Sequence, residues 1–211
     1  MAAEAELRQQ MVATVRELYE AGLITPTGGN LSVRLPEGQG YLITPSMLHK
    51  GSLCAEDMIR LGPDGKPSAG AKGRPSVETP MHLKIYEIRP RCAAVIHTHA
   101  PWATLFGLLE MEVEPITVEA VRFLETPLVP FQMPGSPELV AAVEKVLSDS
   151  PAVLLQNHGL LTYGGSLREA ANAALALEDV CQLLIRCRLL HRTPVLIPEQ
   201  AASLLRKFLL G

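Results

Sequence analysis

The sequence has few cysteines, few aromatic residues and little charge. Its 211 residues contain 4 cysteines, and aromatic side chains make up 4%. Cys54, Cys92, Cys181 and Cys187 form no C-x-x-C pair, so we expect small apolar side chains in a reducing compartment and no disulfide framework. The net charge of -3 and the absence of any basic run exclude a nucleic-acid-binding protein as the first hypothesis.

The sequence also lacks a long uninterrupted apolar segment. The longest stretch without an acidic or basic residue, residues 92–109, includes two histidines, two threonines and a proline, which favours a buried segment over a membrane span. Glu4, Glu6 and Arg8 interrupt the N-terminus where a signal peptide needs an apolar core. We therefore expect a cytoplasmic protein without a membrane or nucleic-acid partner.

The composition predicts one globular domain over residues 1–211. Hydrophobic residues make up 47% and charged residues 19%, which is typical of folded proteins. A chain of this length buries about 70% of its surface without disulfide staples. No repeat or linker divides it.

Hydrophobic periodicity and turn residues predict alternating helices and strands. Helices are expected at residues 7–19, 76–89, 101–109, 136–148 and 166–190, and extended segments at 31–34, 41–44, 58–61, 92–96, 116–121, 128–131 and 152–155. Several connections between strands are too short for parallel crossovers. The predicted class is α/β, with three layers and a central, largely antiparallel sheet.

Three histidines form the first candidate site. His97 and His99 stand at the end of a predicted strand, where the period of two sends both imidazoles to one face. His158 follows another apolar strand, and three neutral imidazoles with an open fourth position are a common catalytic zinc shell. Alone, an H-x-H pattern is more often a polar strand end, and His158 could be an ordinary loop residue.

Two further segments could hold an anion. Ser76 and Glu78 begin a predicted helix, where free backbone N–H groups favour a negative charge. The segment from Thr27 to Asn30 contains two glycines, which let backbone amides approach an oxyanion. The alternative is purely structural, with Ser76 as a helix cap and Glu78 interacting with the helix dipole.

The remaining polar candidates have ordinary explanations. Lys50, in a loop, could approach a phosphate but is expected to be solvated, as is its neighbour His49. His82 is explained by capping or solvent exposure. Trp102 is expected to fill the core.

Five motifs together resemble the class II aldolase and adducin family, and within it the aldolases that cleave L-fuculose 1-phosphate. They are T-x-G-N-x-S at 27–32, I-T-P-S at 43–46, P-S-x-E at 75–78, H-x-H at 97–99 and Q-x-H-G at 156–159. The resemblance implies a homotetramer with active sites between subunits. It also implies a zinc-dependent aldolase that cleaves a ketose 1-phosphate to dihydroxyacetone phosphate and an aldehyde.

The resemblance assigns a role to individual residues. Zinc, or alternatively Mn²⁺ or Co²⁺, would be held by His97, His99 and His158. Glu78 would be the catalytic acid/base and an additional ligand when substrate is absent. The cation would stabilise an enediolate, and Glu78 would protonate its carbon. The positions that correspond to the phosphate contacts are Gly29, Asn30, Ser46, Met47, Ser76 and Val77.

Three departures from the family pattern keep the substrate open. Met47 replaces a glycine, and Val77 replaces a serine, although its backbone N–H could still contribute. The tyrosine expected near Val118 is absent; Glu119 or Arg122 could stand in for it, but each is more often an ordinary strand or interface residue. A sugar-acid phosphate decarboxylase or a dehydratase on the same scaffold is therefore the alternative. A non-catalytic adducin-like module is less favoured, because the whole metal set is present.

Overall fold

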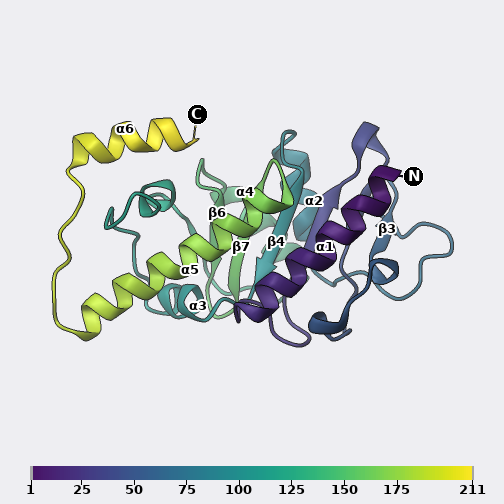
Figure 1. Cartoon of the computed structure of the whole chain (residues 1–211), viewed down its shortest axis with the longest axis horizontal. Coiled ribbons are helices and arrows are strands. Elements are labelled where there is room, and N and C mark those ends of the chain that lie inside the picture. The colour runs from purple at the N-terminus through teal and green to yellow at the C-terminus, as the bar shows by residue number, and fades with distance from the viewer. Residues whose placement is uncertain (1, 211) are drawn as a thin grey trace.

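The computed structural model describes residues 2–210 as a mixed sheet covered by helices on both faces (Figure 1). The strands occur in the sheet in the order β3-β2-β1-β4-β7-β6-β5, and every neighbouring pair is antiparallel except β5 and β6. The strands are β1 Asn30–Arg34, β2 Tyr41–Ile43, β3 Ile59–Leu61, β4 Ala94–Thr98, β5 Leu128–Val129, β6 Ala152–Leu155 and β7 Gly159–Gly164. The α/β class and the largely antiparallel sheet are confirmed.

Five of the six helices between residues 2 and 210 form the outer two layers, and the last helix lies at one end of the molecule, away from the sheet (Figure 1). The helices are α1 Ala2–Glu20, α2 Thr79–Ile88, α3 Pro101–Leu108, α4 Pro137–Val146, α5 Leu167–Leu189 and α6 Glu199–Leu210, with short 3₁₀ turns η1 Pro36–Gly38, η2 Lys50–Ser52, η3 Ala55–Asp57 and η4 Ala120–Phe123. Helices α1, α3 and α5 share one apolar core with the sheet, and α2 and α4 share another. Among residues 2–210 no helix is both long and apolar enough to span a membrane.

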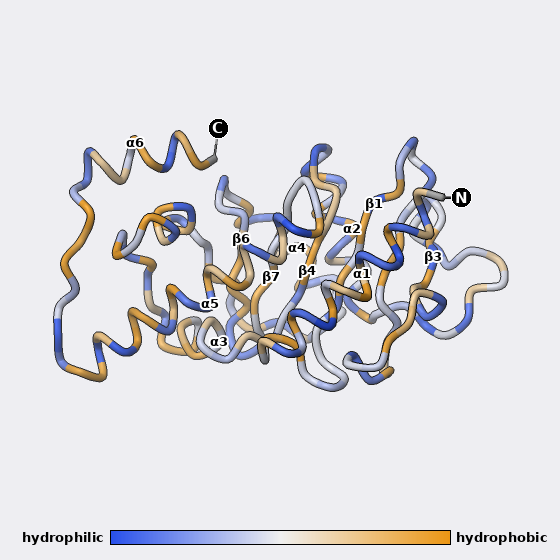
Figure 2. The backbone as a smooth tube through the Cα atoms, viewed as in Figure 1, coloured by the Kyte–Doolittle hydropathy of each residue, from blue (hydrophilic) through white to orange (hydrophobic). Residues whose placement is uncertain are grey.

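Side-chain alternation along the strands builds these two cores. In β4, Ala94 and Ile96 enter the core under α1, α3 and α5, whereas Val95 enters the core under α2 and α4. Because both faces are covered, β6 and the first part of β4 are apolar, and Figure 2 shows hydrophobic colours along the central strands. In β1, by contrast, polar and apolar residues alternate. His97 and Thr98, at the end of β4, are polar residues buried in this largely apolar interior.

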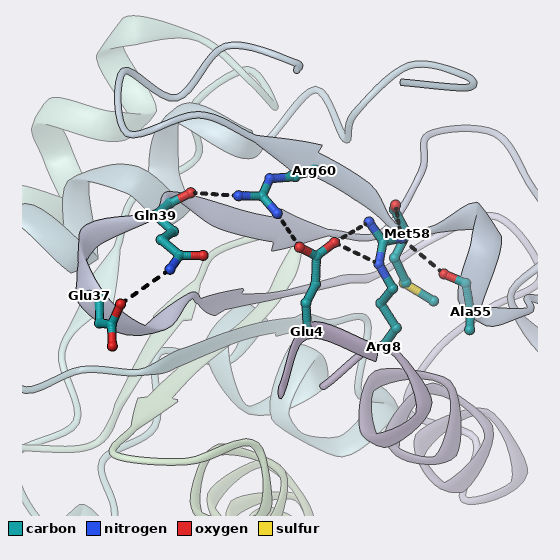
Figure 3. Close-up of polar contacts among 7 residues, drawn as sticks. All are labelled: Glu4, Arg8, Glu37, Gln39, Ala55, Met58 and Arg60. Carbon is teal, nitrogen blue, oxygen red and sulfur yellow. Dashed lines mark hydrogen bonds and ion pairs between the residues drawn. The ribbon is translucent and has the colours of Figure 1, made fainter. Parts of the chain in front are cut away.

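Helix α1 is tied to the edge of the sheet by Glu4, whose carboxylate contacts both Arg8 and Arg60 (Figure 3). Arg8 also donates hydrogen bonds to the backbone oxygens of Met58 at 2.7 Å and Ala55 at 3.1 Å. These contacts join the N-terminal helix to η3 and to the edge strand β3.

The structure differs from the sequence-based prediction at four elements. Residues 116–121 are not extended: Thr117 Oγ1 accepts a hydrogen bond from the Ala120 N–H at 3.1 Å, and the chain turns into η4. Helix α2 begins at Thr79, so that Glu78 occupies the N-cap position and Ser76 lies before the helix. Strand β7 and helix α6 were not predicted.

His82, on α2, is buried, and the prediction of a capping or solvent-exposed histidine is wrong. Its Nδ1 lies 2.8 Å from Ser32 Oγ, which lies 2.8 Å from the Tyr86 hydroxyl. Burial lowers the pKa of His82 to about 3, against 6.5 for an ordinary histidine. The imidazole is therefore neutral in the folded protein.

This burial predicts sensitivity to acid. The unfolded chain binds a proton at His82 below about pH 6.5 and the folded chain does not, so stability falls as the pH falls through this range. Between pH 7.5 and pH 5 the contribution of His82 is a loss of about 2 kcal/mol. Urea unfolding at both pH values should show a smaller loss in His82→Gln than in the parent protein. Equal losses in the two proteins would contradict the burial of a neutral imidazole.

Candidate metal centre and active site

The structure brings His97, His99 and His158 together at one end of the sheet. One nitrogen from each ring lies within 4.8 Å of the other two. The ring centroids of His97 and His158 are 4.6 Å apart, and those of His97 and His99 are 5.0 Å apart. Rings this close, from residues about sixty positions apart in the chain, form a set of donors that can hold a single ion.

Strand pairing explains the convergence. His97 and Thr98 end β4, which pairs with the start of β7, so Thr98 lies opposite Leu160. His158 lies in the tight turn between β6 and β7, where Asn157 has φ 59°. Gly159 packs against β4 so closely that a Cβ would lie 2.2 Å from the carbonyl oxygen of Thr98. Glycine at position 159 therefore lets His158 approach His97.

The hydrogen bond of His97 selects its tautomer. Its Nδ1 lies 3.1 Å from the carbonyl oxygen of Leu160, which can only accept, so Nδ1 carries the proton. The free Nε2 lone pair has no hydrogen-bond partner among residues 2–210. Burial, and then the nearby His158 and His99, lower the pKa of His97 well below the ordinary value. The ring is neutral and its Nε2 is available to a metal.

Glu78 completes the cluster from the N-cap of α2, with 4% of its surface exposed. Its Oε2 lies 3.3 Å from His97 Nε2, and its Oε1 lies 3.3 Å from His158 Nε2. Asn30, which pairs with His97 across β1 and β4, donates a 2.7 Å hydrogen bond to Oε2. A carboxylate oxygen thus faces an unprotonated imidazole nitrogen. A divalent cation fits this donor set, because it would separate and bind both lone pairs.

His99 lies beside the turn that precedes β1. A Cβ on Gly28 would lie 2.4 Å from His99 Nδ1, so only glycine allows this approach. Burial and the charge of His158 lower the pKa of His99, and Glu78 partly opposes them. His99 is therefore also neutral at physiological pH.

The residues assigned to phosphate lie on neighbouring loops. A β-bridge between Pro45 and Pro75 places Ser46 beside the segment that contains Ser76. Ser76 Oγ accepts a hydrogen bond from the Glu78 N–H at 3.2 Å, which links this loop to the candidate acid/base. Gly29 directly precedes Asn30 at the start of β1. The side chains of Met47 and Val77 are 79% and 63% exposed, so their backbones remain the candidate contacts.

Lys50 is a residue that the sequence interpretation placed wrongly. Its side chain was expected to be solvated, but only 3% of the residue is exposed, and Nζ donates a 2.7 Å hydrogen bond to the carbonyl oxygen of Pro45. Burial lowers the pKa of Lys50 to about 8. This buried ammonium supports the loop that carries Ser46. Nothing in the local sequence signals its burial.

The proposed substitutes for the family tyrosine do not join the cluster in this chain. Arg122 lies in η4, with its guanidinium 5.8 Å from the Phe123 ring, and lines a cavity beneath α6. Glu119 is exposed. None of the hydrogen bonds and ion pairs of residues 2–210 connects either side chain to Glu78 or to the three histidines.

Comparison with known proteins identifies the family. The model of the class II aldolase and adducin N-terminal domain matches residues 9–185. The chain belongs to the class II aldolase and adducin family. It is 35% identical over 187 residues to 3-oxo-tetronate 4-phosphate decarboxylase of Escherichia coli K12, covering 86% of this chain and 87% of that protein. It is 34% identical over 175 residues to L-fuculose phosphate aldolase of Methanococcus maripaludis, covering 82% of this chain and 93% of that one.

Solved structures agree with this assignment. The crystal structure of YgbL from Escherichia coli superposes with a TM-score of 0.88 at 30% identity, covering 97% of this chain and 99% of that chain. The relatives of the chain include enzymes named as aldolases, decarboxylases and dehydratases. Members of this family thus share the fold but differ in the reaction that they are named for.

The donor set predicts that metal binding depends on His97. In His97→Ala, zinc affinity should fall at least about 100-fold, because one of three neutral imidazole ligands is lost. Metal content after dialysis, measured by inductively coupled plasma mass spectrometry, tests this. His49→Ala is the matched control, since His49 is exposed and outside the cluster. Retention of stoichiometric zinc by His97→Ala, with the fold intact by circular dichroism, would contradict the assignment.

Proposed function

We propose that the protein is a divalent-metal-dependent lyase that cleaves a carbon–carbon bond beside a carbonyl group in a phosphorylated sugar or sugar acid. The observation that carries this proposal is the buried Glu78 carboxylate, which lies 3.3 Å from the Nε2 atoms of both His97 and His158. Zinc is the favoured ion for three imidazoles, with Mn²⁺ or Co²⁺ as alternatives. Family membership supports a sugar phosphate substrate.

Breaking such a bond leaves an enediolate on the substrate. When bound, the divalent cation supplies positive charge to the oxygens of this intermediate. Glu78 would then donate a proton to the carbon atom of the enediolate. Asn30 holds Glu78 Oε2, whereas Oε1 has no hydrogen-bond partner among residues 2–210, so Oε1 is the atom available to carry the proton.

The number of proton-transfer groups distinguishes two reactions. Aldol cleavage removes a proton from a hydroxyl and adds one to carbon, whereas decarboxylation of a 3-oxo acid needs only the proton added to carbon. Glu78 is the carboxylate of the cluster, and the tyrosine that the family pattern places near Val118 is absent from the sequence. This favours decarboxylation of a 3-oxo sugar-acid phosphate over the aldolase reaction. Cleavage of a ketose 1-phosphate such as L-fuculose 1-phosphate is the second candidate, supported by the similarity to the Methanococcus aldolase.

Two loops are proposed to bind the phosphate. Ser46, Ser76 and the backbone of Gly29 would donate hydrogen bonds, and the buried Lys50 ammonium would add positive potential beneath the Ser46 loop. The backbones at Met47 and Val77 complete this proposed set. Hydroxyl and amide donors together with a nearby cation are typical of phosphate sites.

A homotetramer with active sites between subunits is part of the proposal. Met47, Val77 and Met133 are large apolar side chains with 63–79% of their surface exposed. Met47 and Val77 belong to the proposed phosphate loops. Met133 lies near Val77, because its neighbour Gly135 packs so closely that a Cβ there would lie 2.9 Å from the Val77 carbonyl oxygen. Such exposure beside a candidate site supports coverage by a second copy of the chain.

Product analysis tests the reaction. Zinc-loaded protein should be incubated separately with 3-oxo-tetronate 4-phosphate and with L-fuculose 1-phosphate. Release of carbon dioxide from the first compound would support the decarboxylase, and formation of dihydroxyacetone phosphate from the second would support the aldolase. If neither compound, nor a panel of other ketose and keto-acid phosphates, is cleaved, the lyase proposal is wrong.

Glu78→Gln should keep the metal but lose proton transfer to carbon. The amide cannot act as a general acid, and we expect turnover to fall at least about 1,000-fold. Reaction in deuterium oxide, followed by mass spectrometry of the product, reports this step directly. Glu20→Gln, at an exposed carboxylate of α1, is the matched control. If Glu78→Gln incorporated deuterium into the product at the rate of the parent protein, Glu78 would be excluded as the proton donor.

Lys50→Met should raise KM for the phosphorylated substrate about tenfold and leave kcat within about twofold, because the lost charge acts on binding. The pKa of Lys50, about 8, gives a second test. Above pH 8 the ammonium becomes neutral, so KM should rise with pH in the parent protein and not in Lys50→Met. Parallel pH profiles for KM in the two proteins would show that Lys50 does not act on the phosphate.

A further inference from the structure

A cavity of about 1250 Å³ lies beneath α6. Basic residues outnumber acidic ones in its charged lining, with Arg89, Arg91, Arg122, Arg206 and Lys207 against Asp149, Glu169 and Glu199. Arg206 is already paired with both carboxylate oxygens of Glu125, so Arg89, Arg91, Arg122 and Lys207 provide the excess positive charge. The chain as a whole has a net charge of -3, so this groove reverses the overall sign. Local positive potential in a concave site attracts anions.

The groove is separate from the histidine cluster. Cys92 and Gly164, which line it, stand where β4 begins and β7 ends. His97, Thr98 and Leu160 lie at the other end of the same two strands. Five residues of strand span about 16 Å, so a small ligand cannot reach both places at once.

Three arginines in the groove have unused hydrogen-bonding capacity. The Nε atoms of Arg89, Arg122 and Arg206 are buried, and none has a hydrogen-bond partner among residues 2–210. Other atoms of two of these side chains are held in place: Arg89 donates to the carbonyl oxygen of Ser148, and Arg206 donates to Glu125 Oε2 at 2.6 Å. These Nε atoms have almost no accessible surface, so a ligand in the groove would be bound by terminal guanidinium nitrogens. Those of Arg122 take part in none of the hydrogen bonds or ion pairs found among residues 2–210, and they are free to donate.

The rest of the wall is apolar and fixed. The segment that leads into α6 contributes Leu196, Ile197 and Pro198. The Ile197 N–H donates a 2.8 Å hydrogen bond to the carbonyl oxygen of Pro115, which attaches this wall to the body of the protein. In Figure 1, α6 returns over the body after a long connection from α5. Tight attachment at both Ile197 and Arg206 makes the groove a formed feature of the fold.

We propose that this groove binds an organic phosphate of about nucleotide size, with its phosphates on the arginines and its less polar part against the wall formed by Leu196 and Ile197. Guanidinium groups recognise phosphate through paired N–H donors, and several of them at one place favour more than one phosphate. The volume is larger than a single inorganic phosphate needs. The proposal does not depend on the reaction at the histidine cluster.

Isothermal titration calorimetry with ADP on the full-length protein tests the proposal. Arg91→Gln, at an exposed position, and Arg122→Gln should each weaken ADP binding about tenfold. Arg16→Gln, an equal charge change on the exposed face of α1, should leave binding unchanged. Pyrophosphate should bind more weakly than ADP, because it lacks the part that contacts the apolar wall.

His97→Ala separates the groove from the metal centre. ADP affinity should persist in His97→Ala if the groove is the site, and it should disappear if ADP binds through the metal. Three results would overturn the proposal: no heat with millimolar ADP or pyrophosphate, equal affinity in the parent protein and Arg91→Gln, or loss of binding in His97→Ala. A fourth result that would overturn the proposal comes from size-exclusion chromatography of the arginine variants. If their oligomeric state changed while their ADP affinity did not, the groove would be a subunit interface.

Discussion

The Glu78 carboxylate is buried against a His97 nitrogen that has no proton to offer it. His97 donates its only ring proton to the carbonyl oxygen of Leu160, so the 3.3 Å approach of its Nε2 to Glu78 brings two lone pairs together. Burying an ionised carboxylate costs several kcal/mol unless it is paired. A cation between His97 Nε2 and the Glu78 carboxylate would replace this repulsion with attraction to both atoms. The rest of the candidate site is arranged around that requirement.

The fold meets this requirement by combining four elements at one end of the sheet. His97 comes from β4, Asn30 from β1, Glu78 from the N-cap of α2, and His158 from the turn between β6 and β7. Strands fix the first two through backbone pairing, and the close approach of Gly159 to Thr98 fixes the last. Ligands on rigid elements are held more precisely than ligands on loops. The phosphate residues, by contrast, lie on loops, where substrate-dependent adjustment is easier.

Much of the fold could be predicted from local signals. Two helices were expected to begin at residues 136 and 166. In the structure Ser136 and Ser166 are the N-caps of α4 and α5, and they accept hydrogen bonds from Leu139 N–H and Glu169 N–H respectively. Strand β7 was not predicted, because glycines stand at both of its ends. The hydrogen bond from Ala120 N–H to Thr117 Oγ1 turns a segment that was expected to be extended into η4. In these two segments, tertiary contacts or local side-chain hydrogen bonds determine the secondary structure, and hydrophobic periodicity carries no information about either.

The candidate site was predictable in its residue types and unpredictable in its surroundings. His97, His99, His158 and Glu78 were combined through the family resemblance, because an H-x-H pair by itself is more often a polar strand end. The burial of Lys50 and of His82 could not be inferred in this way. Each is enclosed by elements distant in the sequence, and its pKa is lowered by that enclosure.

A second buried glutamate shows why Glu78 is better explained by function than by structure. Glu178, on α5, accepts hydrogen bonds from the backbone N–H groups of Trp102 at 2.9 Å and Ala103 at 2.7 Å, one on each carboxylate oxygen. It thereby satisfies the free N–H groups at the start of α3 and stabilises the fold. Glu78 stands at the N-cap of α2, but its carboxylate accepts no hydrogen bond from the N–H groups of that helix. Its Oε1 has no hydrogen-bond partner in the described part of the chain. A carboxylate kept buried with unused bonding capacity destabilises the protein by itself, and the proposed binding of a cation and a substrate gives a physical reason to keep it there.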